Sequence, residues 1–371
     1  MRKKILLIFG TRPEAIKMAP LVLEFKSKPH LFVTKICVTA QHREMLDQVL
    51  DFFEIIPDYD LNLMKPNQDL YTLTSDIILG LKPVLIDFCP DFVFVHGDTT
   101  TSSAAALASF YNKSKVCHVE AGLRTFNKWS PFPEEMNRQL TGRIADYHFA
   151  PTKLSESNLL SENILSENIL ITGNTVIDAL IFSSKKVDNY KSEELDLLRA
   201  KLNLNKKIIL VTGHRRENHG QGFIRICNAL KSIAIQMKDV EIVFPVHRNP
   251  NVKEPVLELL SGLSNVILIE PLSYPSFVWL MKVSALIITD SGGVQEEAPS
   301  LGKHVLVMRE TTERPEALEA GTVILVGTDE EKIKKECIRI LTGPEKVEIQ
   351  IHNPYGDGFA AKKIINFIEK L

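Results

Sequence analysis

Charged side chains gather directly after the apolar runs of this 371-residue chain. The first run is followed by Gly10, then by Arg12 and, further along, Lys17. Glycine permits a tight turn, and two cations beside a helix N-terminus would suit an anion such as diphosphate. The alternative is an ordinary strand-turn-helix connection with solvated charges.

Three carboxylates come after later segments of the chain. Asp98 and Glu120 follow apolar runs, and Glu134 follows a Pro-x-Pro segment. Asp98 could cap the helix that follows it, and Glu134 with Glu135 could favour the positive end of a helix dipole. Alternatively, the three acids could lie close together in the folded protein, and carboxylates grouped in this way are suited to proton transfer.

Histidines also follow two apolar runs in the second half of the chain. His214 lies between Gly213 and two arginines, which is a poor position for a core residue, and His247 follows another run. His214 and His219 are five residues apart, which does not place them on one helical face, and no H-E-x-x-H motif occurs. A catalytic metal is therefore not expected.

A glycine pair marks a second potential anion site. The amides of Ser291, Gly292 and Gly293 would open a helix and could cradle a phosphate. Glu297 could hold a ribose through its hydroxyls, and Arg314 could pair with a carboxylate or phosphate. A simple tight turn is the alternative.

Two common nucleotide-binding motifs are absent from the sequence. Neither G-x-G-x-x-G nor G-x-x-x-x-G-K-[ST] occurs, which argues against a nicotinamide or flavin fingerprint and against a P-loop NTPase. We expect no cofactor.

Composition narrows the class of protein. The 44 Lys and Arg nearly balance 46 Asp and Glu, which gives a net charge of −2, and 44% of the residues are hydrophobic. These values exclude a disordered chain and bulk electrostatic binding to nucleic acid or anionic membranes.

The cysteines and the apolar segments indicate a cytoplasmic enzyme. The five cysteines are widely spaced and include no C-x-x-C pair, which argues against a disulfide framework or zinc site. The apolar run Ile5–Phe9 is too short for a signal peptide, and no stretch approaches a membrane span.

Short apolar runs alternate with helical patterns, which predicts two doubly wound α/β domains with mostly parallel sheets. We place the first domain at 1–171 and the second at 172–357, with a C-terminal helix at 358–371. The polar stretch 153–170, with its duplicated SENIL, is interpreted as a local helix and turn. Because ligands bind at the carboxyl ends of parallel strands, we expect an active site in a cleft between the domains.

The strand-end segments together resemble the non-hydrolysing UDP-N-acetylglucosamine 2-epimerases. The matching segments occur in order along nearly the whole chain: GTRPEAIKMAPL (10–21), TAQHREMLDQVL (39–50), HGDTTTS (96–102), HVEAGLRT (118–125), FPEEMNR (132–138), GNTVIDAL (173–180), TGHRREN (212–218), DSGGVQEEAPSLGK (290–303) and TTERPEA (311–317).

The resemblance implies a glycosyltransferase-B-like pair of Rossmann-like domains, with the C-terminal helix returning to the first. It also implies a homodimer and reversible conversion of UDP-GlcNAc to UDP-ManNAc, which supplies surface polysaccharides, through elimination of UDP and 2-acetamidoglucal. The roles it implies are acid/base chemistry or catalysis for Asp98, Glu120, Glu134 and His214, and substrate binding for Arg12, Lys17, Phe277, Ser291, Gly292, Gly293, Glu297 and Arg314.

Two departures from the family pattern stand out. Leu272 occupies a place where relatives often carry Gln beside the uracil. Glu44 follows Gln41 where regulated members carry a Gln pair, and Asn67 stands where Arg is frequent. We therefore expect weak or absent activation by a second UDP-GlcNAc molecule.

Three other functions would use similar residues. A hydrolysing relative would release ManNAc and UDP, and a glycosyltransferase would need an acceptor site, for which the first domain offers no obvious candidate. A non-catalytic UDP-sugar sensor would tolerate the loss of Asp98 and Glu134.

Overall fold

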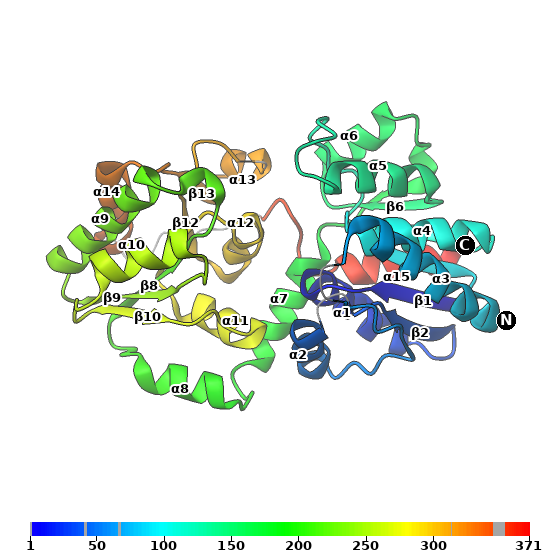
Figure 1. Ribbon diagram of the computed structural model, residues 1–371, viewed down its shortest axis with the longest axis horizontal. Helices are drawn as coiled ribbons and strands as arrows, with labels where there is room; N and C mark the ends of the chain where they lie inside the picture. Colours follow the sequence, from blue (N-terminus) through cyan, green and yellow to red (C-terminus); the bar gives the residue numbers. More distant parts are fainter. Residues whose placement is uncertain (1, 41–42, 66–67, 313, 344–352) are drawn as a thin grey trace. The chain divides into compact units, whose positions relative to one another are not determined.

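The apolar runs of the sequence form two separate parallel β-sheets (Figure 1). The computed structural model describes residues 2–40, 43–65, 68–312, 314–343 and 353–371. Gln41 and Asn67, named above for their bearing on activation, lie outside these residues. The chain divides into two compact units: Met1–Ala179 with Tyr355–Leu371, and Leu180–Pro354.

The first unit contains a seven-stranded sheet in the order β3-β2-β1-β4-β5-β6-β7, with all neighbouring pairs parallel. Its strands are β1 (Lys3–Phe9), β2 (Phe32–Val38), β3 (Tyr59–Asp60), β4 (Phe92–His96), β5 (Lys115–Val119), β6 (Tyr147–Ala150) and β7 (Ile169–Ile171). Its helices are α1 (Arg12–Lys26), α2 (Arg43–Phe53), α3 (Leu70–Phe88), α4 (Thr100–Tyr111), α5 (Glu134–Ile144), α6 (Lys153–Ser161), the first part of α7 (Thr175–Lys186) and α15 (Ala360–Lys370).

Helices cover both faces of this sheet, which explains why most of the residues in its long strands are apolar. On one face, Leu6 and Ile8 of β1 join residues of α3 and α4 in one buried cluster. An aromatic series runs from Phe25 through Phe94 and Phe149 to Phe367 of α15, with ring centroids 5.1 to 6.1 Å apart. The C-terminal helix thus packs on the first unit.

The second unit contains a six-stranded parallel sheet in the order β10-β9-β8-β11-β12-β13. Its strands are β8 (Lys207–Thr212), β9 (Val240–Pro245), β10 (Val266–Ile269), β11 (Leu286–Thr289), β12 (His304–Val307) and β13 (Val323–Leu325). Its helices include the end of α7, α8 (Glu193–Lys201), α9 (Gln221–Gln236), α10 (Pro250–Leu260), α11 (Tyr274–Val283), α12 (Gly292–Glu297), α13 (Pro315–Glu319) and α14 (Glu330–Thr342).

The same chain reversal occurs in both sheets. In the first, the strands proceed outward from β1 to β3, and the chain then returns to place β4 on the other side of β1. In the second, β8 to β10 proceed outward and β11 returns beside β8. Connections diverge at the carboxyl ends of such central strands, which makes these ends the usual ligand sites of doubly wound sheets.

The predicted fold class, two parallel-sheet α/β domains, is confirmed. The interpretation of 153–170 as only helix and turn is wrong at its end, because Ile169–Ile171 pairs in parallel with β6 as strand β7. The chain divides at 179/180 and 354/355 rather than at the expected 171/172 and 357/358. The first part of α7 belongs to the first unit, where Asn174 N donates to the carbonyl of Tyr355 (2.6 Å).

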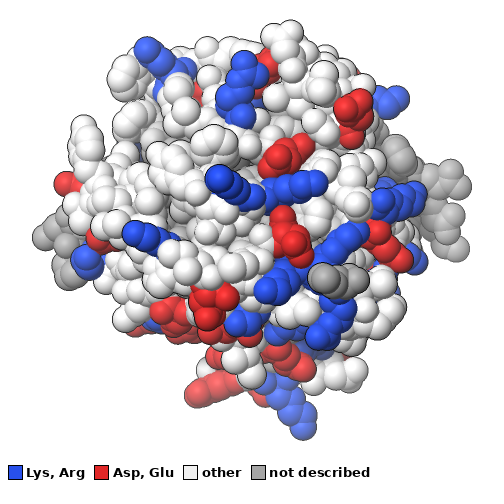
Figure 2. Space-filling model, turned by 90° about the vertical axis from the view of Figure 1, so that its right-hand side faces the viewer, with Lys and Arg blue, Asp and Glu red and all other residues white. Residues whose placement is uncertain are grey.

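The charges on one face of the molecule are mixed, in keeping with the near-neutral composition. Acidic and basic side chains are interspersed over the face shown in Figure 2. Across the described part of the chain, no helix is long and apolar enough to cross a membrane.

Asp178 of α7 joins this helix to the start of α15. Its carboxylate accepts hydrogen bonds from Ala360 N (3.2 Å) and Ala361 N (2.8 Å), which would otherwise be unpaired in the first turn of α15. Burial raises the pKa of Asp178 from 3.8 to about 6.

This pKa predicts a pH dependence of stability. Between about pH 3.8 and 6 the folded state keeps a proton on Asp178 that the unfolded state releases, so lowering the pH favours the folded state. From pH 7 to 5, the native chain should gain about 1 kcal/mol in free energy of unfolding relative to Asp178→Asn, whose amide does not titrate. Urea unfolding at both pH values measures this difference, and parallel changes in the two proteins would contradict it.

Candidate active site

A buried carboxylate organises the central turn of the first sheet. Glu14 is 1% exposed and accepts hydrogen bonds from Gly10 N (3.0 Å) and Thr11 N (2.8 Å). Thr99, at the start of α4, donates to the same carboxylate (2.5 Å). The ends of β1 and β4 are therefore tied together. Arg12 is the first residue of α1, as the sequence predicted.

Gly10 is required by this close approach. A Cβ at this position would lie 1.9 Å from Oγ1 of Thr39, so the buried Thr39 side chain, which is hydrogen-bonded to Thr101, would have to move.

Glu120 lies directly after β5 in a strained backbone conformation, with φ at +60°. Its carboxylate pairs with the Lys17 ammonium and accepts from Asn174 Nδ2 (2.8 Å), and Nε2 of His96 lies 3.6 Å away. Burial raises the pKa of Glu120, but Lys17 and His96 lower it more, so that it lies well below the usual range. Glu120 is thus held as a carboxylate by a cation from α1.

Asp98 lies after β4, and the capping interpretation is wrong for it. Thr99 is the N-cap of α4, where its hydroxyl accepts from Ser102 N (3.1 Å). The Asp98 carboxylate instead pairs with Arg138, and its carbonyl accepts from Asn137 Nδ2 (2.9 Å). Asp98 is therefore tied to α5.

Glu134 is the first residue of α5, so that its predicted place at the positive end of a helix is confirmed. Its side chain is partly exposed and makes no hydrogen bond or ion pair with the residues that the structure describes. Its neighbour Glu135 is fully buried and hydrogen-bonded. Of the two acids, Glu134 is the one accessible to a ligand.

His118 supports the turn that carries Asp98. Its Nε2 donates to the carbonyl of Gly97 (2.7 Å), where the backbone has φ of +64°. Burial lowers the pKa of His118 to about 3, so its ring is neutral at physiological pH.

The second sheet has a corresponding buried carboxylate, Asp290, at the end of β11. Asp290 is fully buried and accepts from His214 N and Arg215 N, both at 2.9 Å. Its other oxygen lies 3.5 Å from Nδ1 of His214, whose ring stacks on His247 with centroids 5.4 Å apart. Burial lowers the pKa of His214, although Asp290 opposes the shift. A largely neutral, half-exposed imidazole results.

The glycine pair lies where the sequence predicted a helix start. Ser291 is the N-cap of α12, and Gly292 is its first residue. A Cβ on Gly292 would lie 2.9 Å from the guanidinium carbon of Arg314, so the absence of a side chain lets Arg314 lie against the helix start. Glu296 holds Arg314 there through hydrogen bonds of 2.8 Å. The Ser291 amide already donates to Oγ1 of Thr289 (2.9 Å). The amides of Gly292 and Gly293, beside the Arg314 cation, suit an anionic group.

Two further predicted residues lie on the same unit. Phe277 is a partly exposed residue of α11, most of whose other side chains are buried. Glu297 is the last residue of α12, and one of its carboxylate oxygens would lie 3.5 Å from a Cβ on Gly293.

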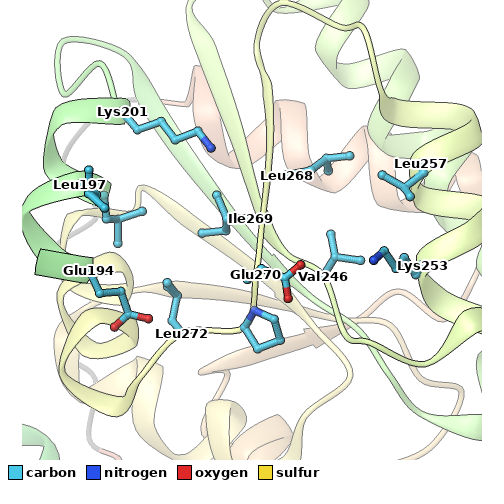
Figure 3. Close-up of a pocket in the computed structure, with 12 residues that line it drawn as sticks. Glu194, Leu197, Lys201, Val246, Lys253, Leu257, Leu268, Ile269, Glu270 and Leu272 are labelled. Carbon is cyan, nitrogen blue, oxygen red and sulfur yellow. The ribbon is translucent and has the colours of Figure 1, made fainter.

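A cavity of about 440 Å³ borders strand β10 (Figure 3). Apolar side chains from α8 and α10 face the cavity, and Lys201 and Lys253 of the same helices lie beside them. Leu272 forms part of the cavity wall. The residue that departs from the family pattern thus borders a cavity whose lining is largely apolar but also includes Glu194 and Glu270.

The structure therefore brings several predicted residues into direct contact within each unit: Lys17 with Glu120, and Gly292 with Arg314. It also adds residues that the sequence analysis did not single out. Their common feature is that each holds a predicted residue in place: Asn174, Arg138, Glu14, Asp290 and Glu296. All five occur inside the segments that carry the family resemblance, which is the signal that could have identified them. Within the described residues, no cluster of His, Cys, Asp or Glu is arranged to hold a metal ion.

The Lys17–Glu120 pair predicts a stability effect. Lys17→Met would leave the Glu120 carboxylate buried without its cation, which should lower the free energy of unfolding by about 3 kcal/mol. Adding Glu120→Gln should restore most of this loss, because the uncompensated charge is then removed. Urea unfolding measures both effects, with Lys153→Met on α6 as the exposed control. A Lys17→Met protein as stable as the native chain would show that the pair is not needed.

Comparison with known proteins agrees with this arrangement. Residues 24–369 match the family described as UDP-N-acetylglucosamine 2-epimerase. A UDP-N-acetylglucosamine 2-epimerase of Salmonella typhimurium is 58% identical over 370 residues, which cover 99% of this chain and 98% of the relative. One from Campylobacter jejuni is 56% identical, over 100% and 98% of the two chains.

Solved structures give the same result. UDP-GlcNAc 2-epimerase from Neisseria meningitidis bound to UDP-GlcNAc is 52% identical with a TM-score of 0.88, covering 99% of this chain and 100% of the other. A Listeria monocytogenes structure of a UDP-N-acetylglucosamine 2-epimerase reaches a TM-score of 0.92 at 48% identity, covering 100% and 96%. By its sequence and by the fold of its two α/β units, this chain belongs to the UDP-N-acetylglucosamine 2-epimerase family.

Proposed function

We propose that this protein is an enzyme that interconverts UDP-GlcNAc and UDP-ManNAc without net hydrolysis. The observation that carries the proposal is the pair of ion-paired carboxylates, Asp98 and Glu120, at the carboxyl ends of neighbouring strands β4 and β5. The names of the full-length relatives, and the UDP-GlcNAc bound in the Neisseria meningitidis structure, support the choice of substrate.

In the proposed reaction, the bond between C1 and the diphosphate oxygen breaks while a base removes the proton from C2. The electrons of the C2–H bond form the C1–C2 double bond of 2-acetamidoglucal, and UDP carries away the electrons of the C1–O bond. Re-addition of UDP to C1, with a proton delivered to the opposite face of C2, completes the epimerisation.

Proton exchange on two faces of C2 calls for more than one acid/base group. Asp98, Glu120 and Glu134 are our candidates. Lys17 holds Glu120 as a carboxylate, and Glu134 is accessible at the start of α5. We leave open which carboxylate serves which face.

The second unit would bind the leaving group. The amides of Gly292 and Gly293 with Arg314 would stabilise the charge that develops on UDP. Ser291, whose amide is bonded to Thr289, would contribute its hydroxyl, and Glu297 would bind the ribose. Burial lowers the pKa of His214, so its imidazole is mostly neutral and can accept or donate a hydrogen bond near the diphosphate. Arg12, the first residue of α1, is a further candidate cation for substrate binding.

Product analysis tests the proposal against its closest alternative. Proton NMR of the purified protein with UDP-GlcNAc and no added cofactor should show UDP-ManNAc accumulating to an equilibrium with the substrate. Free ManNAc with an equal amount of UDP would indicate the hydrolysing reaction instead.

Substitution of the carboxylates also distinguishes an enzyme from a non-catalytic UDP-sugar sensor. Asp98→Asn and Glu134→Gln should each lower kcat by about 100-fold or more, because a group that moves a proton is lost. UDP affinity measured by calorimetry should remain within about threefold of the native value, since neither residue belongs to the proposed UDP site. Full turnover in both variants would contradict the assignment.

We also propose a homodimer that buries the outer face of α3. Leu79 and Ile86 of α3 and Tyr111 of α4 border one hollow, with 68%, 58% and 67% of their surface exposed, and Tyr71, earlier on α3, is 88% exposed. Large apolar side chains exposed together are typical of protein interfaces.

Light scattering after size exclusion tests this surface. The native chain should have twice the monomer mass, and Leu79→Arg should shift it toward the monomer, because a buried unpaired charge opposes association. Leu165→Arg, at an exposed leucine outside this face, should leave the mass unchanged. A monomeric native chain would contradict the proposal.

A further inference from the structure

Glu135, the second residue of α5, is fixed by four donors. It is fully buried and accepts from Thr125 N (3.0 Å), Phe126 N (3.1 Å), Gln139 Nε2 (2.9 Å) and Arg138 Nη1 (3.3 Å). Burial raises the pKa of Glu135, but these hydrogen bonds together lower it below its usual value. The Glu135 carboxylate is therefore a fixed negative charge at the start of α5, within hydrogen-bond reach of Arg138 on the same helix.

Arg138 joins this fixed charge to Asp98. Its Nη1 bonds Glu135 and its Nη2 bonds the Asp98 carboxylate, while its side chain is only 11% exposed. A guanidinium can reach two carboxylates at once because its terminal nitrogens are held in one plane, whereas lysine offers a single nitrogen. The geometry thus uses a property that only arginine has.

The backbone at Asp98 is held without Arg138. Asn137 donates to the Asp98 carbonyl, and His118 donates to the carbonyl of Gly97. What Arg138 adds is the orientation of the Asp98 carboxylate and a positive charge beside it.

Arg138 also lies one turn from Glu134. The two are four residues apart on α5 and therefore share a face of the helix. Because Arg138 pairs with Asp98 and stands one helical turn from Glu134, its charge would offset the repulsion of two carboxylates that serve one sugar carbon.

We propose that Arg138 is a positioning residue for the epimerisation: supported by the buried Glu135, it orients the Asp98 carboxylate and balances the charges of Asp98 and Glu134. This inference rests on the proposed function. Its effect should appear in the chemical step rather than in nucleotide binding.

The experiment compares Arg138→Ala, Arg138→Lys and the control Arg143→Ala, which removes an exposed arginine from the same helix. Glu135 keeps three other donors in these variants, which favours retention of the fold. We expect Arg138→Ala to lower kcat by about 100-fold with KM within about threefold, the size of loss seen when reacting groups are misplaced by about 1 Å. Millimolar guanidinium chloride should restore part of this kcat, and sodium chloride should not.

Arg138→Lys keeps the charge but should recover less than a tenth of the native kcat, because a single ammonium nitrogen does not reproduce the two separate nitrogens that contact Glu135 and Asp98. If Arg138→Ala does not fold, this variant decides the question alone. Native kcat in Arg138→Lys or Arg138→Ala, or a loss confined to KM, would overturn the inference. A native protein that makes no UDP-ManNAc would instead refute the proposed function.

Discussion

In each sheet, a buried carboxylate at the central chain reversal accepts hydrogen bonds from two consecutive backbone amides of the neighbouring loop. Glu14 binds the amides of Gly10 and Thr11, and Asp290 binds those of His214 and Arg215. These bonds fix where the chain turns after β1 and β8. A buried carboxylate is costly without such donors, so each loop is held in one conformation. The positions of Arg12 and His214 follow from this constraint.

A second set of interactions places charge around these turns. Glu120 is held by Lys17, which stands on the helix that begins at the Glu14 turn, and Asp98 is held by Arg138 of α5. Each candidate acid/base carboxylate of the strand ends thus has a cation from a neighbouring helix. In both pairs the cation offsets the cost of placing a carboxylate at a partly or fully buried position.

The sequence was informative wherever a local pattern determines the structure. Apolar runs predicted the long strands of both sheets, because strands covered on both faces contain few polar residues. Strand β7 was not predicted, since its three residues end a polar stretch that indicates a helix and a turn. The role of Asp98 shows a different limit: Asp is a good N-cap in isolation, but Thr99 occupies that position and Arg138, forty residues away, binds Asp98. Pairings such as Lys17 with Glu120 depend on strand order, which spacing along the chain does not give. The predicted roles of the site residues remain proposals.

Exchange of the C2 proton with solvent distinguishes epimerisation by elimination from other reactions of a UDP-sugar. The most direct measurement is proton NMR of the protein with UDP-GlcNAc in D₂O, following the C2 signals of substrate and product. We expect deuterium at C2 of UDP-ManNAc, and in time of the recovered UDP-GlcNAc, because the proton leaves to a carboxylate that exchanges with solvent. UDP-ManNAc that retains protium at C2, or UDP-GlcNAc that remains unchanged, would contradict elimination and re-addition at this site.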